Sequence, residues 1–367
     1  MIDVKEEEKV SSSGIFDQVD LMEHEQVVFC NDKATGLKAI IGIHNTVLGP
    51  ALGGTRMWNY ASEQEAITDV LRLSRGMTFK AAISGLNLGG GKAVIIGDSK
   101  KLKSEAFLRR FGKFIESLNG KYVTAEDVNM SPDDMEYIAM ETRHVTGLSE
   151  NIGGGGDPSP VTAFGVYMGM KAAAKKAFGS DDLSGKSVAV QGAGHVGMHL
   201  IDYLAKENAK LYVSDFDQKR ASKAAADYNA IAVGLDEIYD VDMDIYAPCA
   251  LGATINDNTI DRLKCNVVAG AANNQLADEE KHGNQLMQKG IVYAPDFLIN
   301  AGGLINVGID YLGGWSKDRV YKKTEKIYQT TLDILNLSEK EGIHSQKAAI
   351  KLATQRIHEL GKIKTVR

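Results

Sequence analysis

The stretch Ser187-Val-Ala-Val-Gln-Gly192-Ala-Gly194-His-Val-Gly197 decides the fold. Its apolar start, 187–191, predicts a buried strand, and the glycines predict a tight turn that opens a helix to about residue 208. A second strand is expected at 210–214, ending at Asp215, 23 positions after Gly192. A strand, a G-x-G-x-x-G turn, a helix, a strand and an acidic residue in this order are typical of a dinucleotide-binding βαβ unit.

Each glycine of this turn has an expected task. Gly192 permits the tight turn, Gly194 lets the pyrophosphate approach the backbone, and Gly197 lets the helix pack on the strand. The helix N-terminus supplies N–H donors for the phosphates, so Ala193, His195 and Val196 are also candidate contacts. Asp215 would accept hydrogen bonds from the adenosine ribose and repel a 2′-phosphate, which favours NAD over NADP. Lys219 and Arg220 weaken this preference slightly, and a glycine-rich turn without a ligand is the alternative.

Length and composition limit the other possibilities. A chain of 367 residues fits two domains of ~100–200 residues each. A formal charge of −6 argues against a nucleic-acid binder. Three scattered cysteines argue against a disulfide framework or a thiolate zinc site, so no metal is expected. The polar N-terminal dozen residues, expected to fray, resemble no signal peptide, and no apolar run approaches ~18 residues. We therefore expect a cytoplasmic protein with no membrane segment.

The stretch 147–160 is rich in glycine and proline and predicts an interdomain hinge, with a loop inside one domain as the alternative. Before it, strands are expected at 38–44, 93–97 and 122–125, and helices at 62–76, 104–118 and from 131. After it, a helix at 161–178 precedes the βαβ unit, and further βα units follow. Two helical patterns from 317, broken near Gly342, end the chain. The predicted domains are 1–148 plus about 345–367, and 149–344.

Two lysines, Lys80 and Lys92, stand in a glycine-laden stretch, 76–98, that offers few carboxylates to pair them. Burial and a second nearby cation both disfavour the charged form of a lysine, which is how a protein obtains an amine that handles protons near neutral pH. The glycines before Lys92 let the backbone come close to a small molecule. The alternative is a pair of lysines whose stems cover the strand 93–97 while their amines reach solvent.

Six motifs together resemble the glutamate/leucine/phenylalanine/valine dehydrogenase family, and the resemblance runs in consistent order from about residue 15 to the C-terminus. The motifs are Gly49–Trp58 (GPALGGTRMW), Gly76–Lys80 (GMTFK), Gly89–Lys92 (GGGK), Thr124–Val128 (TAEDV), Pro158–Ala163 (PSPVTA) and Asn300–Gly303 (NAGG). The resemblance implies an α/β protein of two domains separated by a catalytic cleft. The first would be an α/β substrate-binding and oligomerisation domain, and the second a Rossmann-type NAD-binding domain.

The implied activity is the reversible, NAD-dependent oxidative deamination of an L-amino acid to a 2-oxo acid, ammonia and NADH. By motif, Lys80 matches the lysine that holds the substrate α-carboxylate. Lys92 matches the catalytic lysine that activates water, and Asp127 the acid/base that exchanges protons with the amino group. The alternative for Asp127 is an ion pair with Arg56 or Arg72. Relatives form homo-octamers or hexamers, so self-association is expected, with no nucleic-acid or membrane partner.

The expected substrate is an aliphatic amino acid. Leu52 matches a lysine that pairs with the side-chain carboxylate in the glutamate enzymes, and an apolar residue there would leave that carboxylate buried and unpaired. Val307 likewise matches a serine of those enzymes. Leucine is expected, with activity on valine and isoleucine; valine or phenylalanine is the alternative, and a non-catalytic NAD-binding regulator a more distant one. The predicted substrate-binding residues, besides Lys80, are Leu52, Gly53, Ala125, Leu304 and Val307.

Three further residues are expected near the cofactor: Thr162, Asn273 (rather than Asn274) and Asn300, each of which could instead be a helix cap or turn residue. Two departures from the family pattern bear on the site. Asn129-Met130 follow Asp127-Val128 where close members usually carry Gly-Thr, and the hinge reads Gly153-Gly-Gly-Gly156-Asp instead of a version containing serine and asparagine. Both are expected to affect the backbone around the site or domain closure.

Overall fold

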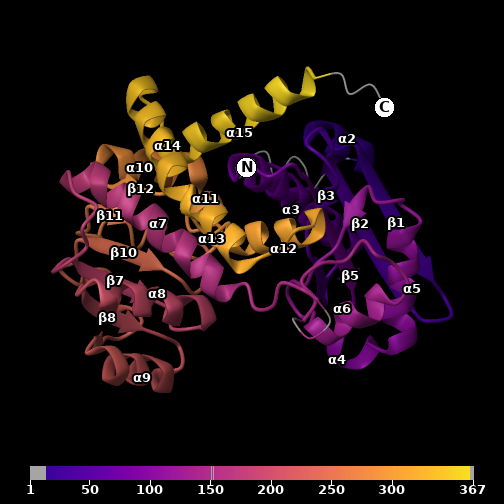
Figure 1. Cartoon of the computed structure of the whole chain (residues 1–367), viewed down its shortest axis with the longest axis horizontal. Helices are drawn as coiled ribbons and strands as arrows, with labels where there is room; N and C mark the ends of the chain where they lie inside the picture. The colour runs from indigo at the N-terminus through magenta and orange to yellow at the C-terminus, as the bar shows by residue number, and fades with distance from the viewer. Residues whose placement is uncertain (1–13, 150, 152, 364–367) are drawn as a thin grey trace. The chain divides into compact units, whose positions relative to one another are not determined.

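The computed structural model describes residues 14–149, 151 and 153–363. The expectations for the N-terminal dozen residues and for the last four residues of the C-terminal helix lie outside this range. The chain folds into two compact units (Figure 1). The first comprises residues 1–157, 306–315 and 353–367, and the second comprises 158–305 and 316–352.

The first unit is built on a mixed six-stranded sheet in the order β1-β2-β5-β3-β6, with β4 also paired to β5. Strand β5 lies antiparallel to β2 and parallel to β3 and β4. The strands are β1 (Gln26–Asp32), β2 (Leu37–Asn45), β3 (Ala51–Leu52), β4 (Thr55–Trp58), β5 (Gly89–Ile96) and β6 (Tyr122–Val123). Strand β5 is therefore the centre of the sheet, and it carries Lys92.

Side chains alternate across this sheet, so each face packs on different helices. Ile40 and Val94 pack against Val70 and Leu71 of helix α3 (Glu63–Ile83), whereas the intervening residues of β2 and β5 pack against α5 (Glu105–Glu116). The unit also contains α2 (Ile15–Leu21), α4 (Ser99–Leu102) and α6 (Pro132–Ala139). Helix α6 begins where the sequence predicted a helix, with Ser131 as its cap and Pro132 at its first position.

Two predicted boundaries in this unit are wrong. Helix α3 does not end near Gly76 but continues to Ile83, so Lys80 lies in its last turn. Gly76 does not adopt the left-handed conformation by which glycine ends a helix, and so the helix passes through it. Strand β5 begins at Gly89, not at Ala93, because the three glycines join the ladder with β2 and β3.

The second unit has a six-stranded sheet in the order β12-β11-β10-β7-β8-β9, and every pairing is parallel. Strands β7, β8, β10, β11 and β12 lie side by side in Figure 1, and α7 packs against β11 and β12. The strands are β7 (Ser187–Gln191), β8 (Lys210–Ser214), β9 (Ile231–Ala232), β10 (Ile245–Pro248), β11 (Val267–Val268) and β12 (Val292–Tyr293). This order, with the first strand at its centre, is that of a Rossmann sheet, and the predicted βαβ unit at 187–214 is confirmed.

The helices of this unit begin with α7 (Ser159–Phe178), which Gly179 ends in the left-handed conformation. The others are α8 (His195–Lys206), α9 (Gln218–Tyr228), the 3-10 helix η2 (Glu237–Asp240), α10 (Glu279–Gln288), α11 (Asp296–Ile299), α13 (Lys317–Glu325) and α14 (Ile327–Glu341). The region after residue 317 contains three helices rather than two. A break at Lys326 separates α13 from α14, and its near-helical backbone angles explain why no sequence signal marks it.

Two helices contribute to both units. Helix α12 (Gly302–Leu312) passes from the second unit to the first at residue 306, and α15 (Ser345–Gly361) does so at residue 353. The compact units thus differ from the predicted domain ranges at 149–157, 306–315 and 345–352. Among the described residues, none of the helices combines the length and apolar character required to span a bilayer.

Candidate active site

Lys92 and Asp127 form a close ion pair in the first unit. The Lys92 Nζ lies 2.6 Å from Asp127 Oδ2, and Lys92 is only 7% exposed. Lys92 shares a face of β5 with Gly90 and Val94, and this face is covered by α3. The partner of Lys92 therefore comes from outside its own stretch, because the segment after β6 brings a carboxylate to it that is 35 positions away in the sequence.

Lys80 belongs to the helix that covers this face of the sheet. A Cβ on Gly90 would come within 2.1 Å of the Thr78 nitrogen, so α3 and β5 touch backbone to backbone two residues before Lys80. Lys80 is partly buried, and its carbonyl accepts hydrogen bonds from the backbone and hydroxyl of Ser84. The last turn of α3 is thereby fixed against the strand that carries Lys92.

The Asp127 carboxylate has a second cationic partner, Arg56 of β4, whose Nε lies 3.3 Å from the same Oδ2. Arg56 Nη1 also binds Asp69 Oδ2 at 3.1 Å, and Arg72 binds Asp69 rather than Asp127. Burial raises the pKa of Asp127, but Lys92 and Arg56 outweigh burial and hold it below its usual value. The ion pair expected as an alternative role for Asp127 thus exists beside its contact with Lys92.

Glycines bring the backbone around this pair into close contact. A Cβ on Gly53 would lie 1.7 Å from the Gly91 carbonyl oxygen, and one on Gly54 would lie 2.5 Å from the carbonyl oxygen of Glu126. The Tyr122 hydroxyl donates to the Gly53 carbonyl at 2.7 Å. No larger residue fits at these two glycines, so β3, β4 and the Asp127 segment are held in one arrangement.

Four of the five residues predicted beside Lys80 for substrate binding lie in the first unit: Leu52, Gly53, Ala125 and Val307. Leu52 is 2% exposed and Ala125 is 7% exposed. Ala125 and Val307 meet at Gly147, where a Cβ would be 4.0 Å from the Ala125 Cβ and 3.7 Å from Val307 Cγ1. Leu304, three residues before Val307 on α12, belongs to the second unit.

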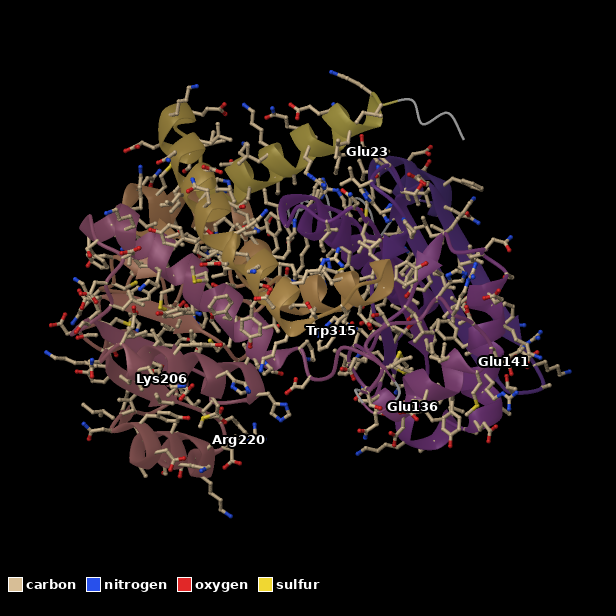
Figure 2. All side chains as sticks on the ribbon, in the orientation of Figure 1. Glu23, Glu136, Glu141, Lys206, Arg220 and Trp315 are labelled. Atoms are coloured by element: carbon tan, nitrogen blue, oxygen red, sulfur yellow. The ribbon has the colours of Figure 1, made fainter. Side chains whose placement is uncertain are left out.

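The two departures from the family pattern have local explanations. Asn129 adopts a left-handed φ of 58°, a conformation that glycine prefers, and its side-chain amide donates to the Met57 carbonyl at 3.0 Å. In the glycine-rich segment, the Gly155 carbonyl accepts from Asn306 Nδ2 at 3.1 Å. Asn306 Oδ1 in turn accepts from the indole of Trp315, labelled in Figure 2, at 2.8 Å. This part of the predicted hinge is thus tied to α12.

The turn at 192–197 in the second unit fits a dinucleotide. Gly192 has a φ of 113°, and a Cβ on Gly197 would lie 2.0 Å from the Gly192 carbonyl oxygen, so both positions require glycine. A Cβ on Gly194 would meet nothing within 4 Å, which leaves open space over the backbone that starts α8. The predicted candidates Ala193, His195 and Val196 complete this turn, so a phosphate there would meet helix N–H groups.

Asp215 stands at the end of β8, beside this turn. Its Oδ2 accepts a hydrogen bond from the Ala193 amide at 2.7 Å, and its Oδ1 accepts one from the Asp217 amide at 2.8 Å. Arg220, at the start of α9 in Figure 2, is exposed and lies 3.7 Å from Asp217. The carboxylate is therefore oriented beside the turn, as a group that binds a ribose would be.

The remaining cofactor candidates form two contacts in the second unit. A Cβ on Gly303 would lie 3.0 Å from the Thr162 hydroxyl, which donates to the Pro158 carbonyl within α7. Asn300 Nδ2 donates to Asn273 Oδ1 at 2.7 Å. Asn274 instead has a left-handed φ of 51°. The side chain of Asn273 is thus the one joined to Asn300, whereas Asn274 makes the turn.

Sequence reasoning missed the groups that hold Arg56. Asp69 receives Arg56, Arg72 and the Tyr60 hydroxyl, the last at 2.6 Å. Asp69 lies on the buried side of an ordinary amphipathic helix pattern, and nothing in its spacing points to β4. One signal was available. Arg56 lies between the buried Thr55 and Met57 on a strand beside a glycine pair, and an arginine in such a position needs a carboxylate partner.

A Rossmann unit and a second α/β unit that holds a buried lysine–aspartate pair define a class of protein, the two-domain dehydrogenases. The chain belongs to the glutamate/leucine/phenylalanine/valine dehydrogenase family. Residues 24–144 match the Glu/Leu/Phe/Val dehydrogenase dimerisation domain, and residues 153–220 and 212–364 match the Glutamate/Leucine/Phenylalanine/Valine dehydrogenase domain. The family resemblance expected from the motifs is confirmed.

Individual relatives agree with this membership. The chain is 58% identical to leucine dehydrogenase of Thermoactinomyces intermedius over 351 residues, which cover 96% of this chain and 95% of the relative. It is 55% identical to leucine dehydrogenase of Bacillus subtilis over 346 residues, or 94% of each chain. The crystal structure of L-tryptophan dehydrogenase from Nostoc punctiforme matches with a TM-score of 0.86 and 44% identity, covering 96% of this chain and 100% of that one.

Proposed function

We propose that this protein catalyses the reversible, NAD-dependent oxidative deamination of L-leucine and other branched-chain L-amino acids to 2-oxo acids and ammonia. The observation that carries the proposal is the contact between the buried Lys92 and the half-buried Asp127, with 2.6 Å between Nζ and Oδ2. An amine and a carboxylate in contact can move protons to and from a substrate nitrogen and a water molecule. Both reacting partners of a deamination need such a proton transfer.

Three side chains have distinct roles in this proposal. Lys80 binds the substrate α-carboxylate through its ammonium group. Asp127 takes the proton that the substrate ammonium must lose, because the α-carbon can release hydride only when the nitrogen is a neutral amine. Lys92 then stabilises the charge that forms at the substrate carbon and activates the water that attacks it. The Arg56 and Lys92 contacts, which lower the Asp127 pKa, support an ionised carboxylate ready to accept that proton.

NAD, when bound, supplies the acceptor for the hydride. In the second unit, the turn 192–197 would hold its pyrophosphate, and Asp215 its adenosine ribose, so that a 2′-phosphate is disfavoured. Thr162, Asn273 and Asn300 are proposed to contact the cofactor. Their hydrogen bonds with Pro158 and with each other support fixed side-chain orientations.

Leucine is the proposed substrate because the pocket residues offer apolar surface and no charge. Leu52 and Ala125 are nearly fully buried, and the relatives named above that share 55% and 58% identity are leucine dehydrogenases. One methylene changes binding by only ~1–3 kcal/mol, so valine and isoleucine are expected to react as well. Gly53, Leu304 and Val307 complete the proposed set of substrate contacts.

Self-association is part of the proposal, since the first unit matches a family domain described as a dimerisation domain. We propose a homo-oligomer that acts in the cytoplasm. Sedimentation or light scattering of the purified protein would measure its size, and a monomer at micromolar concentration would contradict this point.

The proposed function is tested with a panel of L-amino acids and either NAD or NADP, following the absorbance of the reduced nicotinamide. We expect the highest kcat/KM for leucine with NAD, lower values for valine and isoleucine, and little turnover of glutamate. Preference for phenylalanine would move the assignment to the aromatic members of the family. No turnover of any branched-chain or aromatic amino acid would refute the enzyme assignment.

A further inference from the structure

We propose that Arg56 is a positioning residue for this reaction: it fixes the Asp127 carboxylate beside Lys92 and sets the pH range in which the pair works. The inference rests on the proposed function, because it takes Asp127 as the group that exchanges protons with the substrate. Arg56 does so through Asp127 and without touching the reacting atoms.

The geometry around Asp127 supports this role. Lys92 Nζ and Arg56 Nε converge on one oxygen of the carboxylate, Oδ2, at 2.6 and 3.3 Å. Two donors that hold the same oxygen from different strands limit rotation of the carboxylate, so the orientation of its other oxygen is set before a substrate arrives. Outer partners that orient a reacting group in this way usually have measurable effects on rate.

Arg56 is itself held in place by a second carboxylate. Its backbone lies in β4, where Arg56 pairs with Val94 of β5, two residues beyond Lys92. Its Nη1 binds Asp69 Oδ2 at 3.1 Å, and Asp69 also accepts a hydrogen bond from the Tyr60 hydroxyl. One guanidinium therefore bridges two carboxylates with different nitrogens. A lysine carries the same charge but lacks the rigid fork that this bridge requires.

The charge of Arg56 is permanent, and its neighbouring carboxylates raise its pKa further. The other titratable groups around Asp127 are Lys92 on β5, Tyr122 on β6, Tyr60 ahead of α3 and the adjacent Glu126. Of these groups only Lys92 is a cation. Removing Arg56 takes away a fixed positive charge, so Asp127 would keep its proton to a higher pH and the working range would move upward.

A purely structural role is the competing explanation, because Arg56 also joins β4 to α3 through Asp69. If Arg56 only joined these two elements, replacing it would change the stability of the fold. It would not change the pH dependence of kcat/KM or the balance between kcat and KM. A positioning residue moves both, and its lysine variant separates the effect of charge from the effect of orientation.

The experiment compares Arg56→Gln, Arg56→Lys and, as a control, Arg110→Gln. Arg110 lies on α5, pairs with Asp32 at 3.1 Å and has no contact with Asp127. With leucine and NAD, we expect Arg56→Gln to move the pH profile of kcat/KM upward by about 1 unit. We also expect kcat to fall about 10–100-fold, with KM within about threefold of wild type. Arg56→Lys should keep the profile and lose part of kcat, and the control should match wild type.

Two results would overturn this role of Arg56. An Arg56→Gln variant that folds and keeps the wild-type kcat and pH profile would overturn it. If that variant does not fold, Arg56→Lys decides, since full kcat in a protein without the guanidinium fork would also overturn it. A wild-type protein that oxidises no amino acid refutes the proposed function instead, whereas an active wild type with indifferent Arg56 variants refutes this inference alone.

Discussion

At the scale of single residues, the site depends on charges that are buried together. Lys92 is 7% exposed, and an isolated buried ammonium group would be costly, so its stability depends on Asp127 at 2.6 Å. Asp127 is in turn shared with Arg56. The three residues lie 36 and 35 positions apart in the sequence, and only the β4–β5 pairing and the segment after β6 bring them together.

This distance limits what the sequence could predict. Family motifs predicted roles for Lys92 and Asp127, and the shared ion pair between Asp127 and Arg56 was foreseen only as an alternative. Which carboxylate pairs with a given lysine or arginine depends on the register of strands that are not neighbours in the sequence. No local pattern encodes that register. For the same reason, Asp69 on a helix face gave no sign that it holds Arg56.

A prediction at the scale of single residues concerns the effect of replacing Leu52 on activity. Leu52 is 2% exposed on β3, directly opposite Gly90 of β5. Leu52→Lys should lower kcat/KM for leucine by about 100-fold or more, because a buried ammonium without a partner costs several kcal/mol. Leu52→Met, which conserves volume, is the control and should stay within about tenfold of wild type. Steady-state kinetics of both variants test this prediction, with circular dichroism as a check on folding. A fully active Leu52→Lys variant would show that Leu52 is not one of the residues that contact the substrate.

At the scale of elements, the packing of α3 on β5 is central to the first unit. Their contact is close because Gly90 leaves room for Thr78 of the helix, and Gly42 of the neighbouring strand β2 does the same for Ser74. The amphipathic pattern predicted α3, but it ended the helix at Gly76 and not at Ile83, about two turns too early, since a glycine without a left-handed conformation does not stop a helix. The predicted strand began only at Ala93, since strand propensity is low for glycine, whereas in the structure the three preceding glycines pair with β2 and β3.

Two buried histidines fill the layer between α3 and the sheet. His24 Nε2 lies 2.7 Å from Ser74 Oγ, and His44 Nδ1 lies 2.8 Å from Thr78 Oγ1. Burial lowers the pKa of His24 to about 4 and that of His44 to about 3. Both histidines are therefore neutral in the folded protein at pH values where the unfolded chain, with a histidine pKa near 6.5, already binds protons.

This difference predicts a loss of stability in acid. The free energy of unfolding should not be reduced by the two histidines above about pH 6.5. It should fall as the pH drops toward 4, by up to about 1.4 kcal/mol per pH unit for each histidine. Urea unfolding midpoints between pH 7.5 and 4.5 measure it. His44→Asn should show a shallower pH dependence, and His199→Gln, at an exposed position on α8, should behave like wild type. Equal midpoints across this pH range in wild type would contradict the burial of neutral histidines.

At the scale of the whole molecule, the two proposed halves of the chemistry belong to different units. The lysine–aspartate pair and four of the apolar pocket candidates lie in the first unit, and the glycine turn with Asp215 lies in the second. The Rossmann sheet was predictable because its signals are local: a strand, a turn and a helix in immediate succession. The crossing of α12 between the units was not, since a helix pattern carries no information about which core its two ends join. The C-terminal helix was expected to join the first domain from about residue 345, whereas in the structure it does so from residue 353.

Because the lysine–aspartate pair and the glycine turn belong to different units, one measurement tests the proposed chemistry most directly. Lys92→Ala should lower kcat for leucine by about 10²–10⁴-fold, because it removes the amine to which the proposal assigns the activation of water. NAD binding, measured by calorimetry on the same preparation, should stay close to wild type, because the turn proposed to bind it is in the other unit. A Lys92→Ala protein that keeps most of its kcat with leucine would contradict the role assigned to the pair.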